Sequence, residues 1–449
     1  MITIQDLKSL AEHGFCGVFG KMISEGKLAS ICEEHEPVAR RPRKRATSEL
    51  VGDLVYHQLH QDGTLAQHAN ELGGEPISDS AFAQRRALLP QALFAQLLEA
   101  GLAPLADAKG HPECFYKGRR LVGVDGTELS VTNTEANKAL PKANTRRGKA
   151  AFAKLKLVTA MELGLHNPLA AEVGQLSDYE VHLALALWPR LPMHSLIIVD
   201  RLYGVARHIA QLIHAGKGRD QALLVKVRDH RIRSTHLESL SDGSSLVEIR
   251  PSRRKGQPKG EPIKVREINA DLQTPDGKII RVRLWTTLLD CAAYPAAELA
   301  RLYAQRWEHE LAYRELKLSV RKGDRLDSHT PETAFQEIAA IILAVAAVAR
   351  MRTASSDILE APTQRVSLRK ILFATRALWT AFDLGCDFLT KKQKDLMIQR
   401  YFQRLYKTAI LPQKRSRHCP RAIRQPVSGW PRLLERTQSS GAISITIVP

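Results

Sequence analysis

Three acidic residues that lie far apart along the chain could form one catalytic centre. Asp125 ends the apolar segment RRLVGVD, and Asp200 ends the apolar segment HSLIIVD. Each segment has the pattern of a buried strand, where a charge is costly unless it faces solvent, a metal ion or a partner. Two such strands in one mixed sheet bring their carboxylates to the same edge, where ligands bind in open sheets. Glu310, on a helix docked beside that edge, would add a third carboxylate.

Three neighbouring carboxylates predict a site for divalent metal ions. Close carboxylates repel one another, and a divalent cation relieves that repulsion. Oxygen ligands suit Mg²⁺ or Mn²⁺, and we find no His/Cys cluster in the sequence that would indicate zinc. Two such ions about 4 Å apart can activate a water or a 3′-hydroxyl group and stabilise the leaving oxygen in phosphodiester chemistry.

The segment that carries Glu310 also predicts a basic helix face. Residues 303–317, YAQRWEHELAYRELK, contain no Gly or Pro, so we expect one continuous helix. At about 100° per residue, one face of this helix carries Tyr303, Arg306, Glu310, Arg314, Lys317 and Arg321. Its cations would hold DNA phosphates near the carboxylates. The alternative is that Arg306 and Glu310 form a plain surface pair worth roughly a few tenths of a kcal/mol.

Composition favours a folded protein with a polyanionic partner. The chain has 449 residues, 44% of them apolar, and 66 Lys and Arg against 47 Asp and Glu, a formal net charge of +19. This excess favours nucleic acid over charge kept for solubility alone. Six cysteines are scattered without metal-binding spacing, and the longest apolar run, 338–349, is shorter than the ~20 residues of a membrane span. We therefore expect a soluble cytoplasmic protein with 338–349 in a core helix.

The elements that must position these residues divide into five predicted regions. Segments such as ALLVKVR, SLVEIR and IKVREINADL follow one another without a helix between them, which predicts a β-rich insertion. The fold class is therefore α/β, with a mixed sheet, flanking helices, this insertion, and helical N- and C-terminal regions. The regions are 1–112 (helical, DNA-binding), 113–221 (core, first part), 222–290 (β-rich insertion), 291–352 (core, second part, with the Glu310 helix) and 353–449 (helical and basic).

Residues 64–89, TLAQHANELGGEPISDSAFAQRRALL, predict two short helices near the N-terminus. The first ends at Gly73-Gly74, and Ser78 or Ser80 caps the second. The pair resembles a helix-turn-helix whose second helix would offer Gln84 and Arg85 to a DNA groove. An ordinary αα-hairpin explains the same pattern, and both interpretations stay open.

The spacing Tyr303-x2-Arg306-x3-Glu310-x6-Lys317 resembles the Y-R-E-K signature of IS4-family bacterial transposases. These are DDE enzymes with an RNase H-like catalytic core. VDGT carries the first Asp and VDRLYG the second, and a β-rich insertion before the Glu is typical of the family. The resemblance covers roughly residues 40–350. It implies that Asp125, Asp200 and Glu310 are the catalytic residues and bind two Mg²⁺ ions, for which Mn²⁺ can substitute.

The resemblance also implies roles for residues that contact DNA. Tyr303, Arg306 and Lys317 would bind phosphates near the cleaved end. Trp285 matches a Trp on which a flipped base stacks, a sequence-tolerant way to hold an extruded base, although it could equally be a sheet-core aromatic. Trp307 follows Arg306 as a Trp does in known members, with helix packing as its alternative. One departure is Leu202, where relatives often have Gly, and this is expected to alter a turn.

The function implied is that of a cut-and-paste transposase of an insertion sequence. It would bind terminal inverted repeats and target DNA, act as a homodimer in the synaptic complex, and cleave and transfer DNA through a hairpin. Its place would be the bacterial cytoplasm, on the nucleoid. One alternative is a catalytically inactive, sequence-specific DNA-binding regulator on the same fold. Another is a hydrolase with a carboxylate pair, such as a glycosidase, which leaves the basic charge unexplained.

Overall fold

The computed structural model divides the chain into two compact units. The first is drawn from residues 1–196, 215–220 and 307–410, and the second from 197–214, 221–306 and 411–449. The structure describes residues 14–36, 44–60, 62–145, 148–229, 231–251, 260–273, 279–320, 323, 325–385, 388–411 and 444–447. Much of the basic C-terminal region, 412–443, and Arg321 therefore lie outside the described residues.

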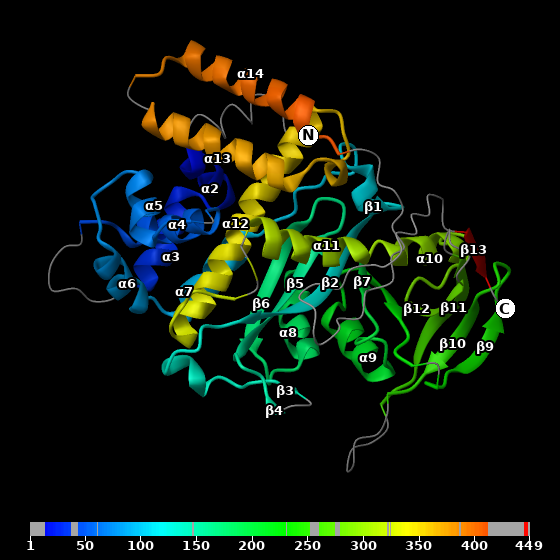
Figure 1. The fold of residues 1–449 in the computed structure, drawn as a ribbon. Helices are drawn as coiled ribbons and strands as arrows, with labels where there is room; N and C mark the ends of the chain where they lie inside the picture. The colour runs from blue at the N-terminus through cyan, green and yellow to red at the C-terminus, as the bar shows by residue number, and fades with distance from the viewer. Residues whose placement is uncertain are drawn as a thin grey trace, which may run out of the picture. The chain divides into compact units, whose positions relative to one another are not determined.

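Helix α12, Pro331–Ile358, is the centre of the first unit's core. Thr330 caps it, because its side chain accepts a hydrogen bond from the Thr333 amide, and Pro331 occupies its first turn. Its apolar run is buried on every side, against α4 and α7 of the N-terminal region and against β6 (Figure 1). It is long and apolar enough to cross a membrane, but 89% of its most apolar window is buried in the protein. The expected core helix at 338–349 is confirmed.

The N-terminal helices share this core, because apolar residues at three- and four-residue spacing face α12. Leu50, Val51, Leu54 and Val55 of α4 are fully buried. The N-terminal helices therefore belong to the core of the first unit. The boundaries of the five regions expected from the sequence stay a prediction. Its helices are α2 Gly14–Met22, α3 Glu25–Glu34, α4 Thr47–Gln58, α5 Leu65–Glu71, α6 Asp79–Ala87 and α7 Gln91–Gly101.

Three long antiparallel strands form the sheet of the first unit, in the order β6, β5, β2 (Figure 1). Asp125 of β2 pairs with Thr159 of β5, and Thr159 pairs with Ala171 of β6. The strands are β1 Phe115–Tyr116, β2 Arg119–Ser130, β5 Lys154–Glu162 and β6 Asn167–Gln175, beside a small pair, β3 Asn144–Thr145 and β4 Gly148–Lys149. Helix α8, Glu180–Leu187, packs against β5 and β6.

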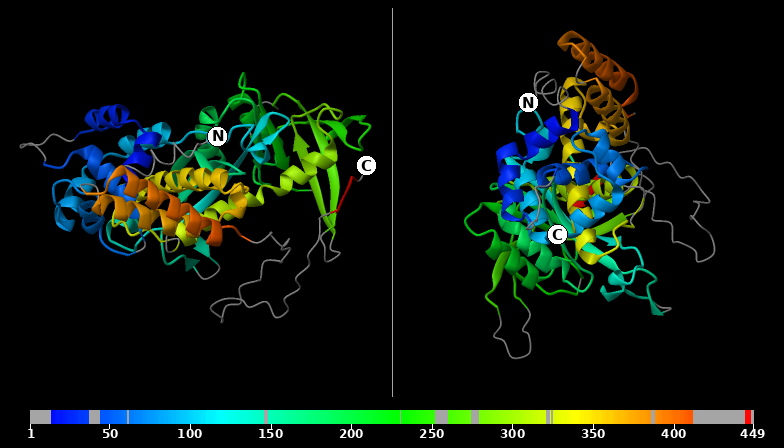
Figure 2. Two further views of the ribbon diagram at one scale, coloured as in Figure 1. Left: turned by 90° about the horizontal axis from the view of Figure 1, so that it is seen from above. Right: turned by 90° about the vertical axis from the view of Figure 1, so that its left-hand side faces the viewer.

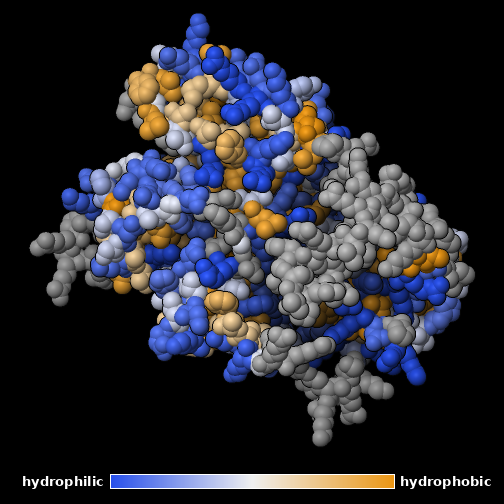
Figure 3. All heavy atoms as spheres, in the orientation of Figure 1, coloured by the Kyte–Doolittle hydropathy of each residue, from blue (hydrophilic) through white to orange (hydrophobic). Residues whose placement is uncertain are grey.

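The second part of the first unit is helical. Helix α11, Trp307–Glu315, runs into a π-helical segment, Leu316–Val320, before α12. Helices α13, Leu368–Leu384, and α14, Lys391–Thr408, lie side by side (Figure 2). Apolar side chains are exposed here among polar ones (Figure 3): Phe373, Leu384, Phe388, Leu396 and Tyr406. Short 3₁₀ turns occur at Pro112–Cys114, Ala136–Ala139, Trp188–Arg190 and Thr363–Arg365.

The second unit is built on strands in the order β7, β8, β12, β11, β10, β9. From β8 onward the strands are antiparallel, and β13 pairs with β11 near the C-terminus. This confirms the predicted β-rich insertion within an α/β fold. The strands are β7 Ser195–Val199, β8 Gln221–Lys226, β9 Thr235–Ser239, β10 Ser245–Ile249, β11 Ile263–Gln273, β12 Ile279–Thr286 and β13 Ser444–Ile447, with helices α9 Ala206–Ala215 and α10 Ala296–Ala304.

Candidate active site

Asp125 lies where β2 changes from a buried to a partly exposed strand. Residues 121–124 are buried, and Asp125 and the three residues after it are half-buried. The carboxylate accepts a hydrogen bond from the Gly126 amide over 2.9 Å. The prediction that this strand ends on Asp125 is wrong, because β2 continues to Ser130, but Asp125 does lie where the strand becomes half-buried.

Helix α11, which carries Glu310, is hydrogen-bonded directly to β2 and β5. The buried Tyr313 hydroxyl donates to the Asp125 carbonyl over 2.7 Å and accepts from the Thr159 amide over 3.2 Å. His309 contacts the Thr159 hydroxyl, with Nε2 and Oγ1 2.9 Å apart. Burial, together with the charges of Asp125 and Glu180, raises the pKa of Tyr313 well above its usual range, so the phenol stays protonated and keeps donating. The half-buried Glu310 thus lies on a helix fixed to the strand of Asp125.

Two glycines of β2 leave room for side chains that pack closely against the strand. A Cβ atom on Gly123 would lie 2.5 Å from Leu163 Cδ2 and 2.8 Å from His309 Nδ1. A Cβ atom on Gly126 would lie 2.4 Å from Glu180 Oε2. Neither glycine has a positive φ, so the absence of a side chain is what the positions require. Glu180 is the first residue of α8, and its carboxylate packs over the residue that follows Asp125.

The single helix expected over 303–317 is wrong. Helix α10 ends at Ala304, and the Gln305 and Arg306 amides bond to Leu302 and Tyr303, three residues back, before α11 begins. The residues of the predicted stripe are therefore divided between elements, with Tyr303 on α10 and Glu310 on α11. Within the first unit, Lys317 Nζ donates to the Glu128 carbonyl of β2 over 3.1 Å, and Arg314 is exposed.

A buried charged network holds the other side of α11. His166, in the turn between β5 and β6, contacts Glu315 Oε2 over 2.7 Å and Glu308 Oε2 over 3.0 Å. Arg352 of α12 also donates to Glu315 over 3.1 Å. Burial alone would lower the pKa of His166, but Glu315 and Glu308 outweigh it and raise that pKa above 6.5. A protonated His166 therefore ties both ends of α11 to the sheet.

Asp200 follows β7 in the second unit and starts a tight turn. Its Oδ1 accepts a hydrogen bond from the Leu202 amide over 2.6 Å, and its carbonyl accepts one from Tyr203. Leu202 is therefore compatible with this turn, despite its departure from the Gly of relatives. The carboxylate is half-buried, like those of Asp125 and Glu310.

Cations gather near the ends of β7 and β8 in the second unit. Lys226 is half-buried at the end of β8. Its pKa is lowered mainly by burial and further by the positive charges of Arg201 and Arg306. Repulsion among these three side chains marks a place where an anion would be stabilised. Arg306 is a predicted DNA-contacting residue, whereas Arg201 and Lys226 were not singled out in the sequence. Tyr303 is almost completely buried, with 8% of its surface exposed.

The two tryptophans predicted to contact DNA differ in exposure. Trp285 is fully buried in the second unit, donates through Nε1 to Glu267 over 2.8 Å and packs beneath Arg283. Trp285 therefore has the position of a sheet-core aromatic residue. Its ring would have to leave this buried position in order to stack on a base. Trp307 is 52% exposed at the start of α11, so simple helix packing does not account for it.

The N-terminal helix pair matches an αα-hairpin better than a helix-turn-helix. The link between α5 and α6 spans seven residues, 72–78, rather than the 3–4 of the DNA-binding motif. Asp79 in the first turn of α6 accepts a hydrogen bond from Ala66, which places an acid where phosphate would bind. Arg85 donates inward to the Arg45 carbonyl, and Gln84 is exposed. DNA contact by these two residues stays a prediction.

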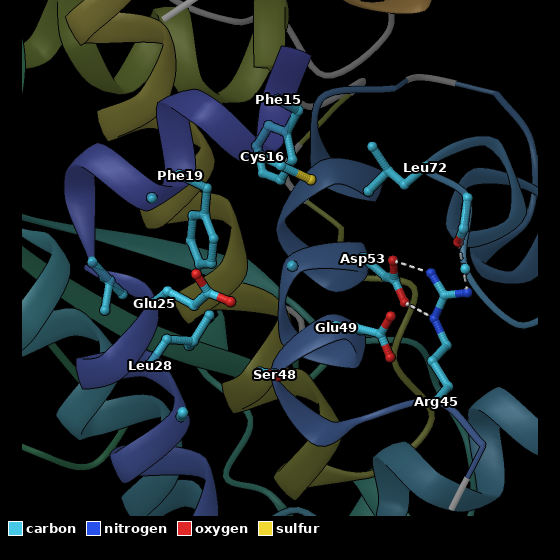
Figure 4. A pocket seen from close by; sticks show the side chains of 16 residues that line it. Phe15, Cys16, Phe19, Glu25, Leu28, Arg45, Ser48, Glu49, Asp53 and Leu72 are labelled. Carbon is cyan, nitrogen blue, oxygen red and sulfur yellow. Dashed lines mark hydrogen bonds and ion pairs between the residues drawn. The ribbon is translucent and has the colours of Figure 1, made fainter. Parts of the chain in front are cut away.

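A pocket between α2, α3 and α4 contains none of the predicted catalytic residues (Figure 4). Phe15, Phe19 and Leu28 form its apolar wall. Both carboxylate oxygens of Asp53 accept hydrogen bonds from Arg45, each over 2.7 Å. Arg45 and Asp53 are thus paired with each other, whereas Glu49 accepts a hydrogen bond from the Ala46 amide and Glu25 also lines the pocket.

The chemistry of the acids fits Mg²⁺ or Mn²⁺. Asp125, Asp200 and Glu310 offer only oxygen ligands, which are the ligands that these ions prefer. All three are half-buried, so each can keep a carboxylate in partial contact with water. Tyr313, His309 and Gly123 support the site but were not predicted. The sequence did contain one sign of this packing, which is Gly123 within an apolar strand. A glycine at such a position often indicates that another group approaches the strand closely.

Known proteins that are similar to this chain are transposases. The family model described as "Transposase DDE domain" matches residues 116–346. The transposase InsG for insertion sequence element IS4 of Escherichia coli (strain K12) is 25% identical over 427 residues, 92% of this chain and 93% of the relative. A piggyBac transposase, solved as a synaptic complex with hairpin DNA, aligns over 92% of this chain and 89% of its own at 11% identity, with a TM-score of 0.45. That last likeness is too low to carry an argument.

Proposed function

Because the chain belongs to the IS4 family of DDE transposases, we propose that it excises an insertion sequence and inserts it into target DNA. It recognises the terminal inverted repeats as duplex DNA and brings two ends together as a homodimer. Asp125, Asp200 and Glu310 are its catalytic residues. The reaction proceeds by hydrolytic nicking, a hairpin at the element end, opening of that hairpin and strand transfer.

One observation carries this proposal. The helix of Glu310 is hydrogen-bonded to the strand of Asp125 through the Tyr313 hydroxyl and the Asp125 carbonyl. Two acids from segments 185 residues apart in the sequence are thereby held on adjoining elements. A protein that only bound DNA would need the cations but not such a rigid placement of acids.

The third acid, Asp200, completes the proposed site. It directly follows the buried strand β7, whereas Asp125 lies within β2, and the turn after Asp200 is fixed by its own carboxylate. When bound, two Mg²⁺ ions supply an activated water or 3′-hydroxyl group and stabilise the leaving oxygen. The three carboxylates hold the ions, and the hydrogen bonds of α11 keep Glu310 in place during successive reaction steps.

Cations of this chain hold the DNA backbone against the acids. Lys226, Arg201 and Arg306 are proposed to bind phosphates near Asp200, because their mutual repulsion falls when an anion lies among them. Arg314 and Lys317 bind phosphates near Glu310. Exposed Trp307 is the better placed of the two tryptophans to meet a base or sugar.

The competing function is a regulator that binds element ends without cutting them. A direct test incubates end-labelled duplexes from both DNA flanks of the gene with the protein, with and without Mg²⁺, and resolves products on denaturing gels. We expect Mg²⁺-dependent nicks at a defined end and a hairpin product. Asp125→Asn is expected to bind the same ends without cutting, while Glu128→Gln, on the same strand, cuts normally.

Glu128 is a fitting control because its partly exposed carboxylate pairs with Lys154 over 2.7 Å. Its contact with Lys317 uses the main-chain carbonyl, which the Gln variant keeps. Binding without cutting by the wild type would favour the regulator. Loss of DNA binding by folded Asp125→Asn would show that Asp125 has a role other than the one proposed.

A further inference from the structure

A cluster of histidines in the N-terminal region has ligand geometry that the transposase reaction does not use. His60 follows α4, while His68 and Glu71 lie on α5. One ligand atom of each of these three side chains lies within 4.8 Å of the others. His57, one turn before His60, places its Nδ1 2.8 Å from His68 Nδ1. Three imidazoles and one carboxylate therefore converge at the turn between two helices.

The orientation of His68 suits a metal ligand. A Cβ atom on Gly63 would lie 2.7 Å from His68 Nε2, so this nitrogen faces the backbone of the turn, and Gly63 has a φ of +97° that favours glycine. The other nitrogen, Nδ1, then faces His57. Metal-binding histidines commonly direct their second nitrogen to backbone or carboxylate groups, which fixes the ring.

The polar atoms of His60 are incompletely satisfied. Among the described residues, its Nε2 is buried without a hydrogen-bond partner. Its Nδ1 lies 3.1 Å from Arg376 Nη2, so the ring accepts a hydrogen bond there. The buried Nε2 of His60 is therefore available to bind a metal ion.

We propose that His60, His68 and Glu71, with His57 as the fourth ligand, bind a Zn²⁺ ion that fastens α4 to α5. Nitrogen-rich ligands exclude Mg²⁺ and Ca²⁺ and suit zinc. Tetrahedral zinc with bonds of about 2.0–2.1 Å needs ligand atoms roughly 3.3 Å apart. The ligand atoms of His60, His68 and Glu71 lie within 4.8 Å of one another, so side-chain adjustment is needed to reach that spacing. The rings of His60 and His68 are stacked 4.3 Å apart at 28°, so ion binding tilts them and displaces Arg376. The signal in the sequence was His57-x2-His60-x7-His68-x2-Glu71, which contains no cysteine.

The test uses the full-length chain without a histidine tag, stripped by a chelator, loaded with Zn²⁺ and passed through gel filtration. We expect about one zinc per chain by elemental analysis and a higher melting temperature with zinc. Glu71→Gln, an exposed position, should retain its helicity and lose at least about tenfold in zinc affinity. Arg376→Gln should bind zinc more tightly, because a cation beside the ion is removed.

Two controls separate this site from other zinc binding. Exposed His214→Gln, and Asp125→Asn at the proposed catalytic site, should both keep the bound zinc. The inference is overturned if the wild type retains no zinc, if Glu71→Gln binds zinc as the wild type does, or if either control removes it. Because the assay uses neither DNA nor Mg²⁺, its outcome is independent of the transposase reaction.

Discussion

At the scale of single residues, the fold holds some charges in unfavourable surroundings. Lys226 is the clearest case, since burial and two neighbouring arginines all lower its pKa. A residue of this kind costs stability and is expected to be kept for a ligand. Under the proposed function, that ligand is a DNA phosphate.

Replacing Lys226 with Gln is expected to weaken DNA binding without destabilising the protein. One lost phosphate contact should lower the salt dependence of log K by about 0.9, and the fold should be equally or more stable because repulsion is removed. Fluorescence anisotropy over a salt series and urea unfolding measure the two effects. Lys138→Gln, whose lysine pairs with Glu135, is the control. Unchanged affinity combined with a less stable fold would assign Lys226 a structural role.

At the scale of elements, the decisive feature is how α11 is attached to the sheet. Tyr313 and His309 connect it to β2 and β5, and His166 connects Glu308 and Glu315 to the turn between β5 and β6. These contacts lie on both sides of Glu310 in the sequence. The helix is therefore a rigid carrier whose displacement should affect cutting before it affects binding.

Stability should depend on pH through His166. Its folded pKa is raised above 6.5, so its contribution is complete below about pH 6.5 and is lost as pH rises through the folded value. His166→Asn keeps a residue that tolerates the positive φ of 55°. It should cost about 3 kcal/mol at pH 6 and less at pH 9, as measured by urea unfolding.

His194→Asn is the matched control, because His194 also has a positive φ and also contacts a carboxylate, that of Asp220, but at an exposed position. Its replacement should cost at most about 1 kcal/mol. Equal losses for the two variants would contradict the role given to the buried network.

The close packing of α11 against β2 can be tested by adding one methyl group. Gly123→Ala should force His309 and Leu163 apart, cost about 1–3 kcal/mol, and reduce cutting much more than end binding. Gly52→Ala, in α4 with no atom within 4 Å of its added Cβ, should be neutral or slightly stabilising. Melting curves and nicking assays report both effects. Normal cutting by Gly123→Ala would show that Glu310 does not depend on this contact.

At the scale of the whole molecule, much of the fold followed from pattern. The core helix around 338–349, the buried strand before Asp200 and the β-rich insertion could be predicted from the sequence, because burial imposes period and composition. The strand of Asp125 was also predicted, but its end was not, since β2 continues to Ser130. The break in the helix at Gln305 and Arg306 could not be predicted. Two backbone hydrogen bonds shift there from the fourth to the third preceding residue, and this shift does not change the pattern of polar and apolar residues in the sequence. The buried position of Trp285 depends on Glu267, a cross-strand partner that the local sequence does not specify.

The net charge of +19 also predicts behaviour of the whole chain. Binding to unrelated duplex DNA should fall steeply with salt, because each phosphate contact releases condensed counterions. The binding free energy for element ends should include an additional contribution from base contacts, and this contribution depends less on salt. Titrations of both duplexes at several salt concentrations measure this difference. Identical salt dependence and affinity for the two duplexes would argue against recognition of terminal repeats.

The central claim is that Asp125, Asp200 and Glu310 bind metal together. Fe²⁺ in place of Mg²⁺, with ascorbate and peroxide, generates radicals that cut the polypeptide near the bound ion, and mass spectrometry locates the cuts. We predict cuts around all three residues in the wild type and in Glu128→Gln, and their joint loss in Glu310→Gln. Cuts at only one of the three, or cuts that persist in Glu310→Gln, would contradict the account.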